Sequence, residues 1–265
     1  MSTNKRDEPR AAAPRTNVIR WIIIVVLAVV VIVAVAIPRL TYWLGTRGKA
    51  VVILEPKTED RVRTTTMATL ERVLRERAEV LDLERPFVRS KRDTVTVAFK
   101  PGDDFQEVVT TLSTRGDMNF RPVPGDYGPD DRKITPTEIF LIGTDEKELL
   151  AQEVVKDVEP IVRRDDLRRK SSLDTDARTN QPLIRVYLEP TAEQALGIWY
   201  AGHENGLLAI TFDDKIISVA PLPARVSDYM NISGIFDRKE AEKIVACLKT
   251  DPLPIDVAVR DKWLP

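Results

Sequence analysis

The sequence contains very few of the residues that bind metals or carry out covalent catalysis. Cys247 is the only cysteine and His203 the only histidine among the 265 residues. One cysteine cannot form an intramolecular disulfide, and it cannot supply a paired-cysteine metal motif. A zinc site built on histidine would also lack ligands. We therefore expect neither a disulfide framework nor a metal centre.

Neither sign of charge dominates the sequence. Lys and Arg number 40 and Asp and Glu number 41, which gives a formal net charge of −1. Proteins that bind nucleic acids present a basic surface to the phosphates, so this balance gives no reason to expect a nucleic-acid partner. Hydrophobic residues make up 43% and charged residues 31% of the chain, which is typical of a folded domain.

Catalytic motifs are absent as well. The sequence has no P-loop, no GxGxxG and no HExxH pattern. Nucleophilic catalysis needs a base beside the nucleophile, and we expect His203 to be a surface residue and Cys247 a buried thiol on an apolar helix. Acidic pairs in turns lack the spacing of a calcium loop, and turn formation explains them better: Asp103–Asp104, Asp130–Asp131, Asp165–Asp166 and Asp213–Asp214. We expect no catalytic, cofactor-binding or metal-binding residues, and hence no enzyme.

One long apolar run stands near the N-terminus. Residues 21–37 read WIIIVVLAVVVIVAVAI, and apolar residues continue to Leu44. A helix rises about 1.5 Å per residue, so a segment of this length crosses a hydrocarbon core of about 30 Å. Trp21 at one end and Tyr42 with Trp43 at the other suit the two membrane interfaces. We predict a transmembrane helix over Trp21–Leu44 that anchors the protein in the lipid bilayer.

A cleaved signal peptide is the alternative for this segment. Ala34-Val35-Ala36 has the small-x-small form of a cleavage site, but the apolar run exceeds the usual core of about 7–15 residues. More basic residues precede the segment than follow it: Lys5, Arg6, Arg10, Arg15 and Arg20 before, and Arg39, Arg47 and Lys49 after. The positive-inside rule then predicts a single-pass protein with a disordered cytoplasmic tail, residues 1–20, and an extracytoplasmic main domain.

The residues after the apolar run show strand and helix patterns in turn. Alternation and β-branching predict strands, and apolar residues three or four apart predict helices. The patterns predict strands at 50–54, 93–99 and 118–123 and helices at 66–83 and 105–113, an order that indicates a small sheet with helices on one face. The pattern weakens over 124–182, where strands are expected near 138–142 and 154–162 and the charged run 163–170 is expected to be a solvated linker.

Regular patterns return after Pro182. They predict a strand at 183–188, a helix at 191–201, a hairpin of 207–212 with 215–220, a strand at 231–236, a helix that Asp237 caps and a last strand at 255–259. We therefore predict an α+β fold with mixed or antiparallel sheets and helices packed on one face.

The C-terminal part of the chain resembles a known family. It reads LLAITFDDKIISVAPL and, after a short loop, NISGIFDRKEAEKIVACLKTDPLPIDVAV. These residues resemble the first periplasmic domain of SecD, a protein-export subunit, in which a strand, an Asp-Gly-Lys turn and a strand ending Ser-Ala-Pro precede an Ile-Ser-Gly segment and a helix. The corresponding residues are Asp213, Lys215, Ser218, Ala220, Pro221, Ile232, Ser233, Gly234, Phe236, Glu240, Ala241, Leu253 and Pro254.

The N-terminal part of the domain is similar to SecD too. The segments TLERVLRERAEVLDLERPFV, VTVAFKPGDDF and MNFRPV resemble its first helix and the two strands that follow. The sequence departs from the pattern at Asp214, Ile235 and Asp251-Pro252, which replace two glycines and an asparagine of SecD. SecD continues into further membrane helices, and we expect this chain, which ends at Pro265, to lack them.

The resemblance implies a domain organisation and a function. It implies a ferredoxin-like base subdomain at 50–123, a linker or insertion at 124–182, and a head region with the closing strand at 183–259. It also implies a non-catalytic accessory of protein translocation at the inner membrane. The implied partners on its periplasmic side are unfolded secreted polypeptide, export-channel subunits, or a SecF-like or SecD-like membrane protein.

The apolar loop 221–235 is the expected contact segment, through Pro221, Leu222, Val226, Tyr229, Met230 and Ile235. Packing under the sheet is the alternative role of these side chains. The alternative function is an envelope scaffold or adaptor that uses the same fold without a role in export.

Overall fold

The computed structural model describes residues 46–58, 62–102, 104–125, 127–128, 130–143, 147–203, 206–221 and 227–265. The chain divides into two compact units, Met1–Arg47 and Gly48–Pro265, and the second is described below. The predicted cytoplasmic tail and transmembrane helix lie outside the described residues. Among the helices that are described, none has the length and apolar character needed to cross a membrane.

The first lobe of the domain is built from both ends of the described chain. We call it the base lobe; it contains β1 (Ala50–Pro56), α2 (Thr64–Val80), β2 (Phe87–Lys91), β3 (Thr94–Phe99), α3 (Phe105–Ser113) and β13 (Val257–Trp263). Its sheet has the strand order β13-β1-β3-β2 with antiparallel neighbours. This is the β-α-β-β-α-β arrangement of ferredoxin-like folds, with the last strand supplied from far along the sequence.

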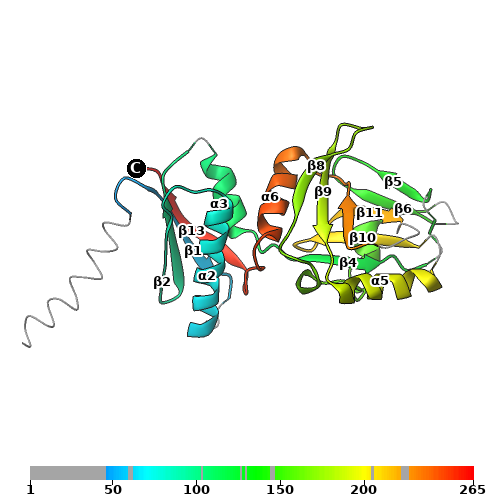
Figure 1. Ribbon diagram of the computed structural model, residues 1–265, viewed down its shortest axis with the longest axis horizontal. Helices are drawn as coiled ribbons and strands as arrows, with labels where there is room; N and C mark the ends of the chain where they lie inside the picture. The colour runs from blue at the N-terminus through cyan, green and yellow to red at the C-terminus, as the bar shows by residue number, and fades with distance from the viewer. Residues whose placement is uncertain are drawn as a thin grey trace, which may run out of the picture. The chain divides into compact units, whose positions relative to one another are not determined.

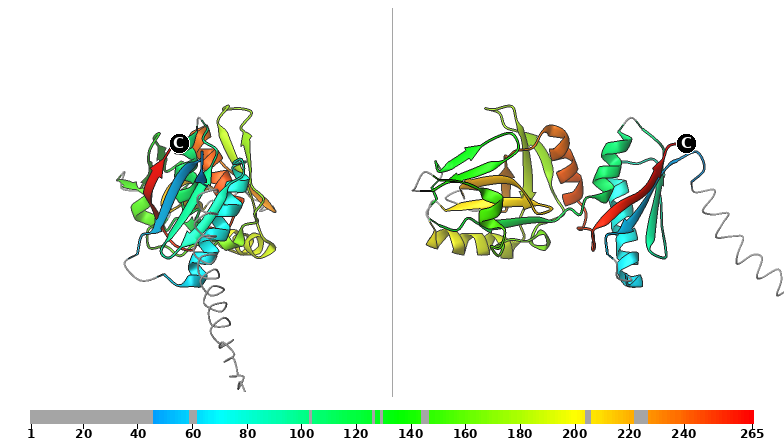
Figure 2. Two further views of the ribbon diagram at one scale, coloured as in Figure 1. Left: turned by 90° about the vertical axis from the view of Figure 1, so that its left-hand side faces the viewer. Right: turned by 180° about the vertical axis from the view of Figure 1, so that it is seen from behind.

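Both helices of the base lobe cover the same face of its sheet, as the two opposite views show (Figures 1 and 2). Strand alternation directs Ala50, Val52 and Leu54 of β1 into this layer, where they pack with Leu70 and Leu74 of α2. The sequence analysis found one strand at 93–99, whereas the structure contains a hairpin of β2 and β3. β2 was missed because its polar and basic residues, RSK, hide the alternation.

The second lobe, which we call the head lobe, is inserted between α3 and β13. Its elements are β4 (Met118–Pro122), β5 (Arg132–Ile134), β6 (Ile139–Ile142), β7 (Glu148–Leu150), α4 (Ala151–Val155), the 3₁₀ turn η1 (Arg164–Asp166), β8 (Ser172–Thr175), β9 (Pro182–Tyr187), α5 (Pro190–Gly202), β10 (Leu207–Phe212), β11 (Lys215–Pro221), β12 (Tyr229–Ile232) and α6 (Arg238–Leu248). They form three antiparallel sheets, in the orders β11-β10-β4, β12-β9-β8 and β5-β6-β7. The predicted α+β fold with antiparallel sheets is confirmed.

Strand β10 explains how the head lobe combines two cores. Leu208 and Ile210 point into the larger core, which α6 and the sheet β12-β9-β8 complete. Leu207 and Ala209 point into the smaller core with β6 and α4. Because both faces of β10 are buried, its sequence is a continuous apolar run instead of an alternating one.

Two predicted strands turned out differently. The strand predicted at 118–123 pairs with β10 of the head lobe and not with the base sheet. An apolar alternating segment such as MNF fits any sheet with a buried face, so its partner is decided only in three dimensions. The strand predicted near 154–162 is wrong: α4 ends at Val155, residues 156–161 are turn and irregular chain, and Val162 forms only an isolated bridge with Phe120. Pro160 has no N–H group to donate to a strand ladder. The predicted subdomain limits, 50–123, 124–182 and 183–259, stay predictions.

Gly234 occupies a place where the backbone passes close to β11. The N–H of Ile235 donates to the carbonyl oxygen of Ile217 at 2.9 Å, and the hydroxyl of Ser218 donates to the carbonyl oxygen of Ser233 at 2.6 Å. A Cβ on residue 234 would overlap the carbonyl oxygen of Ile217 and lie 2.8 Å from Cε1 of Phe236. Only glycine fits there, which explains the Ile-Ser-Gly segment seen in the sequence.

We expect Gly234→Ala to lower the free energy of unfolding by about 1–3 kcal/mol, since the added methyl group must displace backbone. Thermal and urea unfolding of the full chain in detergent, followed by circular dichroism, measures this change. Gly197→Ala is the matched control: nothing lies within 4 Å of a Cβ at this helical position of α5, so the substitution should be neutral or stabilising. Equal stability of the two variants would contradict the prediction.

Candidate functional site

The structure separates the predicted contact residues. Leu222 and Val226 lie outside the described residues, and Pro221 is exposed at the end of β11. Tyr229 and Met230 are neighbours in β12 and therefore point to opposite faces of the sheet. Met230 packs against the larger core of the head lobe, and Ile235 packs against the smaller core. Of the two predicted contact residues in β12, Tyr229 is the one that reaches the surface, where its side chain is 40% exposed.

Tyr229 belongs to a mixed aromatic and charged surface on the sheet β12-β9-β8. The ring of Tyr229 lies 6.1 Å from the ring of Tyr187, the residue directly opposite it in β9. The guanidinium of Arg185 lies 5.1 Å from the centre of the Tyr229 ring, and the ammonium of Lys170 lies 4.7 Å from that of Tyr187. Arg185 also pairs with Asp174 at 3.1 Å. We call these five residues the tyrosine face.

The sequence contained part of the signal for the tyrosine face. A strand was predicted over 183–188, and period-two alternation puts Arg185 and Tyr187 on one side of it, away from the buried Ile184 and Val186. Nothing local indicates that Lys170 or Tyr229 joins them, because these contacts depend on how β8 and β12 flank β9. Tyrosine rings with cations stacked on them offer large, rigid contact area together with hydrogen-bonding groups.

A second polar cluster holds the two lobes together. The chain crosses between the lobes twice, through residues 114–117 and residues 249–256, and Arg77 of α2 contacts both connections. Its side chain is completely buried and donates to the carbonyl oxygens of Thr111, Thr114, Arg115 and Asp251 and to the hydroxyl of Thr250. Five acceptors thus receive the five N–H donors that a guanidinium offers.

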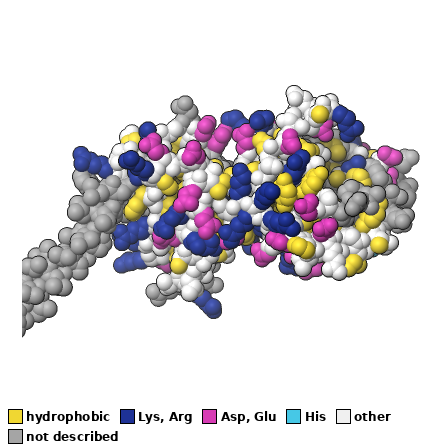
Figure 3. All heavy atoms as spheres, in the orientation of Figure 1, with side chains coloured by type: hydrophobic (Ala, Val, Ile, Leu, Met, Phe, Trp, Pro, Cys, Tyr) yellow, Lys and Arg dark blue, Asp and Glu magenta, His cyan; other side chains and the backbone are white. Residues whose placement is uncertain are grey.

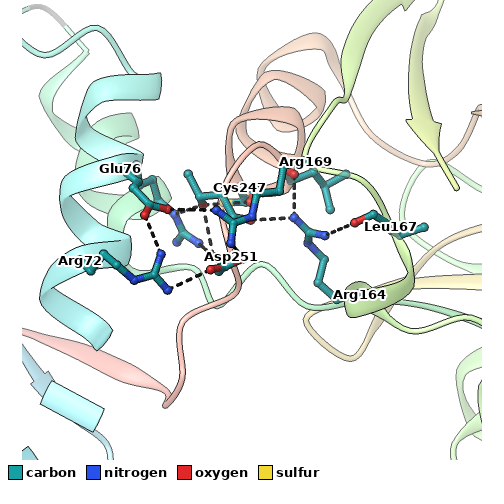
Figure 4. A network of polar contacts seen from close by, with 10 residues as sticks. Arg72, Glu76, Arg164, Leu167, Arg169, Cys247 and Asp251 are labelled. Carbon is teal, nitrogen blue, oxygen red and sulfur yellow. Dashed lines mark hydrogen bonds and ion pairs between the residues drawn. The ribbon is translucent and has the colours of Figure 1, made fainter. Parts of the chain in front are cut away.

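Exposed ion pairs also join the lobes at the returning connection, where Figure 4 shows Arg72 of α2 and Arg169 of the head lobe close to Glu76 and Asp251. Arg72 of α2 pairs with Glu76 at 2.6 Å and with Asp251 at 2.9 Å. Arg169 of the head lobe pairs with Glu76 at 3.6 Å and with Asp251. Two arginines from different lobes therefore share two carboxylates. A further pair, Lys239 of α6 with Glu107 of α3, also joins the lobes.

Arg164 supports the returning connection from the side of the head lobe. Its guanidinium donates to the carbonyl oxygens of Leu248 and Thr250 at 2.7 and 2.6 Å and to that of Leu167 at 3.1 Å. Burial lowers its pKa, although Asp251 and Asp165 act in the opposite direction. Its Nε has no hydrogen-bond partner within the described part of the chain.

Asp213 holds the outgoing connection. Its carboxylate accepts the backbone N–H groups of Arg115, Gly116 and Asp117 at 2.9, 2.8 and 2.8 Å. Asp213 and Asp214 have φ angles of 48° and 63°, so the hairpin turn adopts the left-handed conformation without its usual glycine. Gly116 has a φ angle of 83°, and a Cβ there would lie 3.1 Å from both Arg77 Nη2 and Cys247 Cβ.

The two residues singled out by their rarity lie on different helices of the head lobe, Cys247 in α6 and His203 at the C-terminal end of α5. Cys247 is buried in α6, and burial raises the pKa of its thiol. His203 is exposed at the end of α5, where its ring stacks on Trp199 with 4.9 Å between ring centres. Across the described ranges, no group of three or more His, Cys, Asp or Glu residues could hold a metal ion.

Residues 141–255 match the family described as the SecDF P1 head subdomain. The resemblance to the first periplasmic domain of SecD is confirmed by this match and by relatives of known sequence and structure. The chain is 23% identical over 186 residues to protein translocase subunit SecD of Aquifex aeolicus (strain VF5).

The aligned part makes up 69% of this chain but 36% of that SecD, so the chain spans about a third of its relative's length. Solved structures support the same fold. A crystal structure of SecDF in a super-membrane-facing form superposes with a TM-score of 0.65 and 16% identity, over 83% of this chain and 30% of that one. A structure described as part of work on a membrane component SecDF that enhances protein export superposes with a TM-score of 0.60 and 16% identity. That match covers 80% of this chain and 98% of the solved chain.

We expect Arg77→Met to lower the free energy of unfolding by at least about 3 kcal/mol, because several buried carbonyl groups lose their donor. Chemical unfolding of the full chain in detergent measures the change. Arg75→Met is the control, since Arg75 lies on the same helix in an exposed ion pair with Glu71, and such pairs contribute at most about 1 kcal/mol. A loss below 1 kcal/mol for Arg77→Met would contradict the prediction.

Asp213 should make stability depend on pH. Burial raises its pKa above the ordinary aspartate value of 3.8, although the N–H donors of Asp117, Gly116 and Arg115 oppose this shift. Between the ordinary and the raised pKa, the folded protein binds more protons than the unfolded chain, so the free energy of unfolding falls as pH rises through this window.

The variant Asp213→Asn isolates this dependence. The stability of the wild type relative to the variant should decrease from pH 3.8 upward. Parallel urea titrations at a series of pH values measure it. A difference that increases with pH would mean that the three N–H donors lower the pKa of Asp213 by more than burial raises it.

Proposed function

We propose that this chain is a membrane-anchored, non-catalytic accessory of protein export, whose domain binds emerging polypeptide or export-channel partners on the extracytoplasmic side. The observation that carries the proposal is the match of residues 141–255 to the SecDF P1 head subdomain, together with a fold that covers 98% of a solved chain from work on SecDF. The relatives are named as a translocase subunit and as a membrane component that enhances protein export.

The proposed location follows from the predicted transmembrane helix and from the basic residues before it. The N-terminus lies in the cytoplasm and the domain lies in the periplasm at the inner membrane. Partners in this arrangement are export-channel subunits or a SecF-like or SecD-like membrane protein. The surface charge suits protein partners better than polyanions, since Lys and Arg alternate with Asp and Glu over the visible face (Figure 3).

The tyrosine face is the proposed contact surface for polypeptide. β12 forms an edge of its sheet within the described part of the chain. The N–H of Leu188 donates to the carbonyl oxygen of Asp228, so residues 228, 230 and 232 pair with β9 and the backbone of Tyr229 and Asn231 points to the outer side of the edge, where the Tyr229 carbonyl oxygen accepts the hydroxyl of Ser227 at 2.8 Å. An extended chain can add to such an edge, and the tyrosine rings beside it can contact side chains of many kinds.

A photo-crosslinking amino acid at position 229 of the full-length protein tests the proposal in native membranes. We expect crosslinks to secreted polypeptides or to export-channel subunits, identified by mass spectrometry. The same amino acid at Lys91, the exposed last residue of β2 in the base lobe, is the control and should capture neither. Capture of unrelated envelope proteins, or of second copies alone, at position 229 would favour the alternative, an envelope scaffold that uses this fold without a role in export.

A further inference from the structure

Four chain segments meet at one end of the base sheet. Ala50, the first residue of β1, pairs with Phe99 at the end of β3, and Val51 pairs with Trp263 at the end of β13. Phe87 at the start of β2 pairs with Ala98. This end of the sheet therefore gathers the last residues of β13, Lys262 and Trp263, and residues that flank the strands, Lys49, Arg85 and Leu264; we call these five residues the strand-end patch.

The apolar members of the patch are exposed. Trp263 is 41% and Leu264 55% exposed, although the core of the base lobe is otherwise well filled. Lys262 precedes Trp263 in β13 and therefore points to the opposite face of the sheet, where its Nζ donates to Oε1 of Gln106 at 2.6 Å. At the same end of the sheet, Lys49 Nζ donates to the carbonyl oxygen of Arg85, which precedes β2, at 2.8 Å. Tryptophan beside lysine and arginine is the composition that proteins place at the boundary between lipid and water.

Chain length fixes how far the patch can lie from a membrane. The apolar run ends at Leu44, and β1 begins at Ala50, six residues later. An extended chain spans at most about 3.6 Å per residue, so the start of β1 lies within about 22 Å of the end of the apolar run. A bilayer that this run crosses therefore has its edge within about 22 Å of this end of the base sheet, as measured along the connecting chain.

We infer that the strand-end patch is a lipid-contacting surface, in which Trp263 and Leu264 enter the interfacial region of the bilayer and Lys49, Arg85 and Lys262 face the headgroup phosphates. This inference rests on the predicted transmembrane helix, which the proposed function shares, but not on a role in export. Docking of this end orients the base lobe on the membrane through a second contact besides the anchor. Apolar burial and attraction to anionic lipid both contribute to such contacts.

Spin labels on the full-length protein in lipid nanodiscs of phosphatidylethanolamine and phosphatidylglycerol test the inference. One label is attached at Leu264→Cys and a control label at Ile198→Cys, on the 69% exposed Ile198 of α5. The native Cys247 is completely buried and stays unlabelled. We expect the ratio of collisions with oxygen, which enriches in lipid, to collisions with a water-soluble nickel chelate to be several-fold higher at position 264 than at position 198.

Two outcomes would overturn the inference. Equal ratios at the two positions would show that the patch faces water. A label at position 264 that is open to the nickel chelate in nanodiscs but protected in native membranes would show that a protein covers the patch. Both outcomes are separate from failure of the proposed function, which the crosslinks from position 229 decide.

Discussion

Both connections between the base lobe and the head lobe are held by one buried side chain, Arg77. Its guanidinium donates to Thr111 near the end of α3, to Thr114 and Arg115 on the outgoing connection, and to Thr250 and Asp251 on the returning one. A buried cation is costly to remove from water, and this one is accommodated because each of its donors reaches an oxygen. The two connections are also joined directly, since the N–H of Leu253 donates to the carbonyl oxygen of Arg115 at 2.8 Å, so this bond and Arg77 together fix the position of the head lobe.

Other polar side chains at the junction also form hydrogen bonds with backbone groups at the two connections. Asp213 satisfies three backbone N–H groups of the outgoing connection, while Arg164 satisfies carbonyl groups of the returning one. Gly116 is required because a side chain there would crowd Arg77 and Cys247. The ion pairs of Arg72 and Arg169 lie farther out in contact with water, where each contributes little to stability but where charge complementarity still selects one arrangement of the lobes.

The insertion of the head lobe also constrains folding. β13 pairs with β1 along its whole length, yet these two strands stand at opposite ends of the described chain. Closing so long a loop costs conformational entropy that only the complete base sheet recovers. The head lobe has its own cores and internal sheets, so it can form before β13 completes the base lobe.

By itself, the sequence determined the local elements, the α+β class and the resemblance to SecD, because periodicity, capping residues and turn residues act over a few positions. It also contained the tyrosine at position 229 and, through the alternation of 183–188, the side of the strand on which Arg185 and Tyr187 lie. Arg77 could have been singled out as well, since it falls on the apolar side of its helix, between Val73 and Leu81.

Tertiary structure alone decided which sheet Met118–Pro122 joins, which groups Arg77 contacts, and how Trp263 comes to lie beside the start of β1. These outcomes depend on contacts between residues far apart in the sequence. For such pairs, apolar pattern and charge specify that a partner is needed but not which one, and only packing of the whole domain makes the choice.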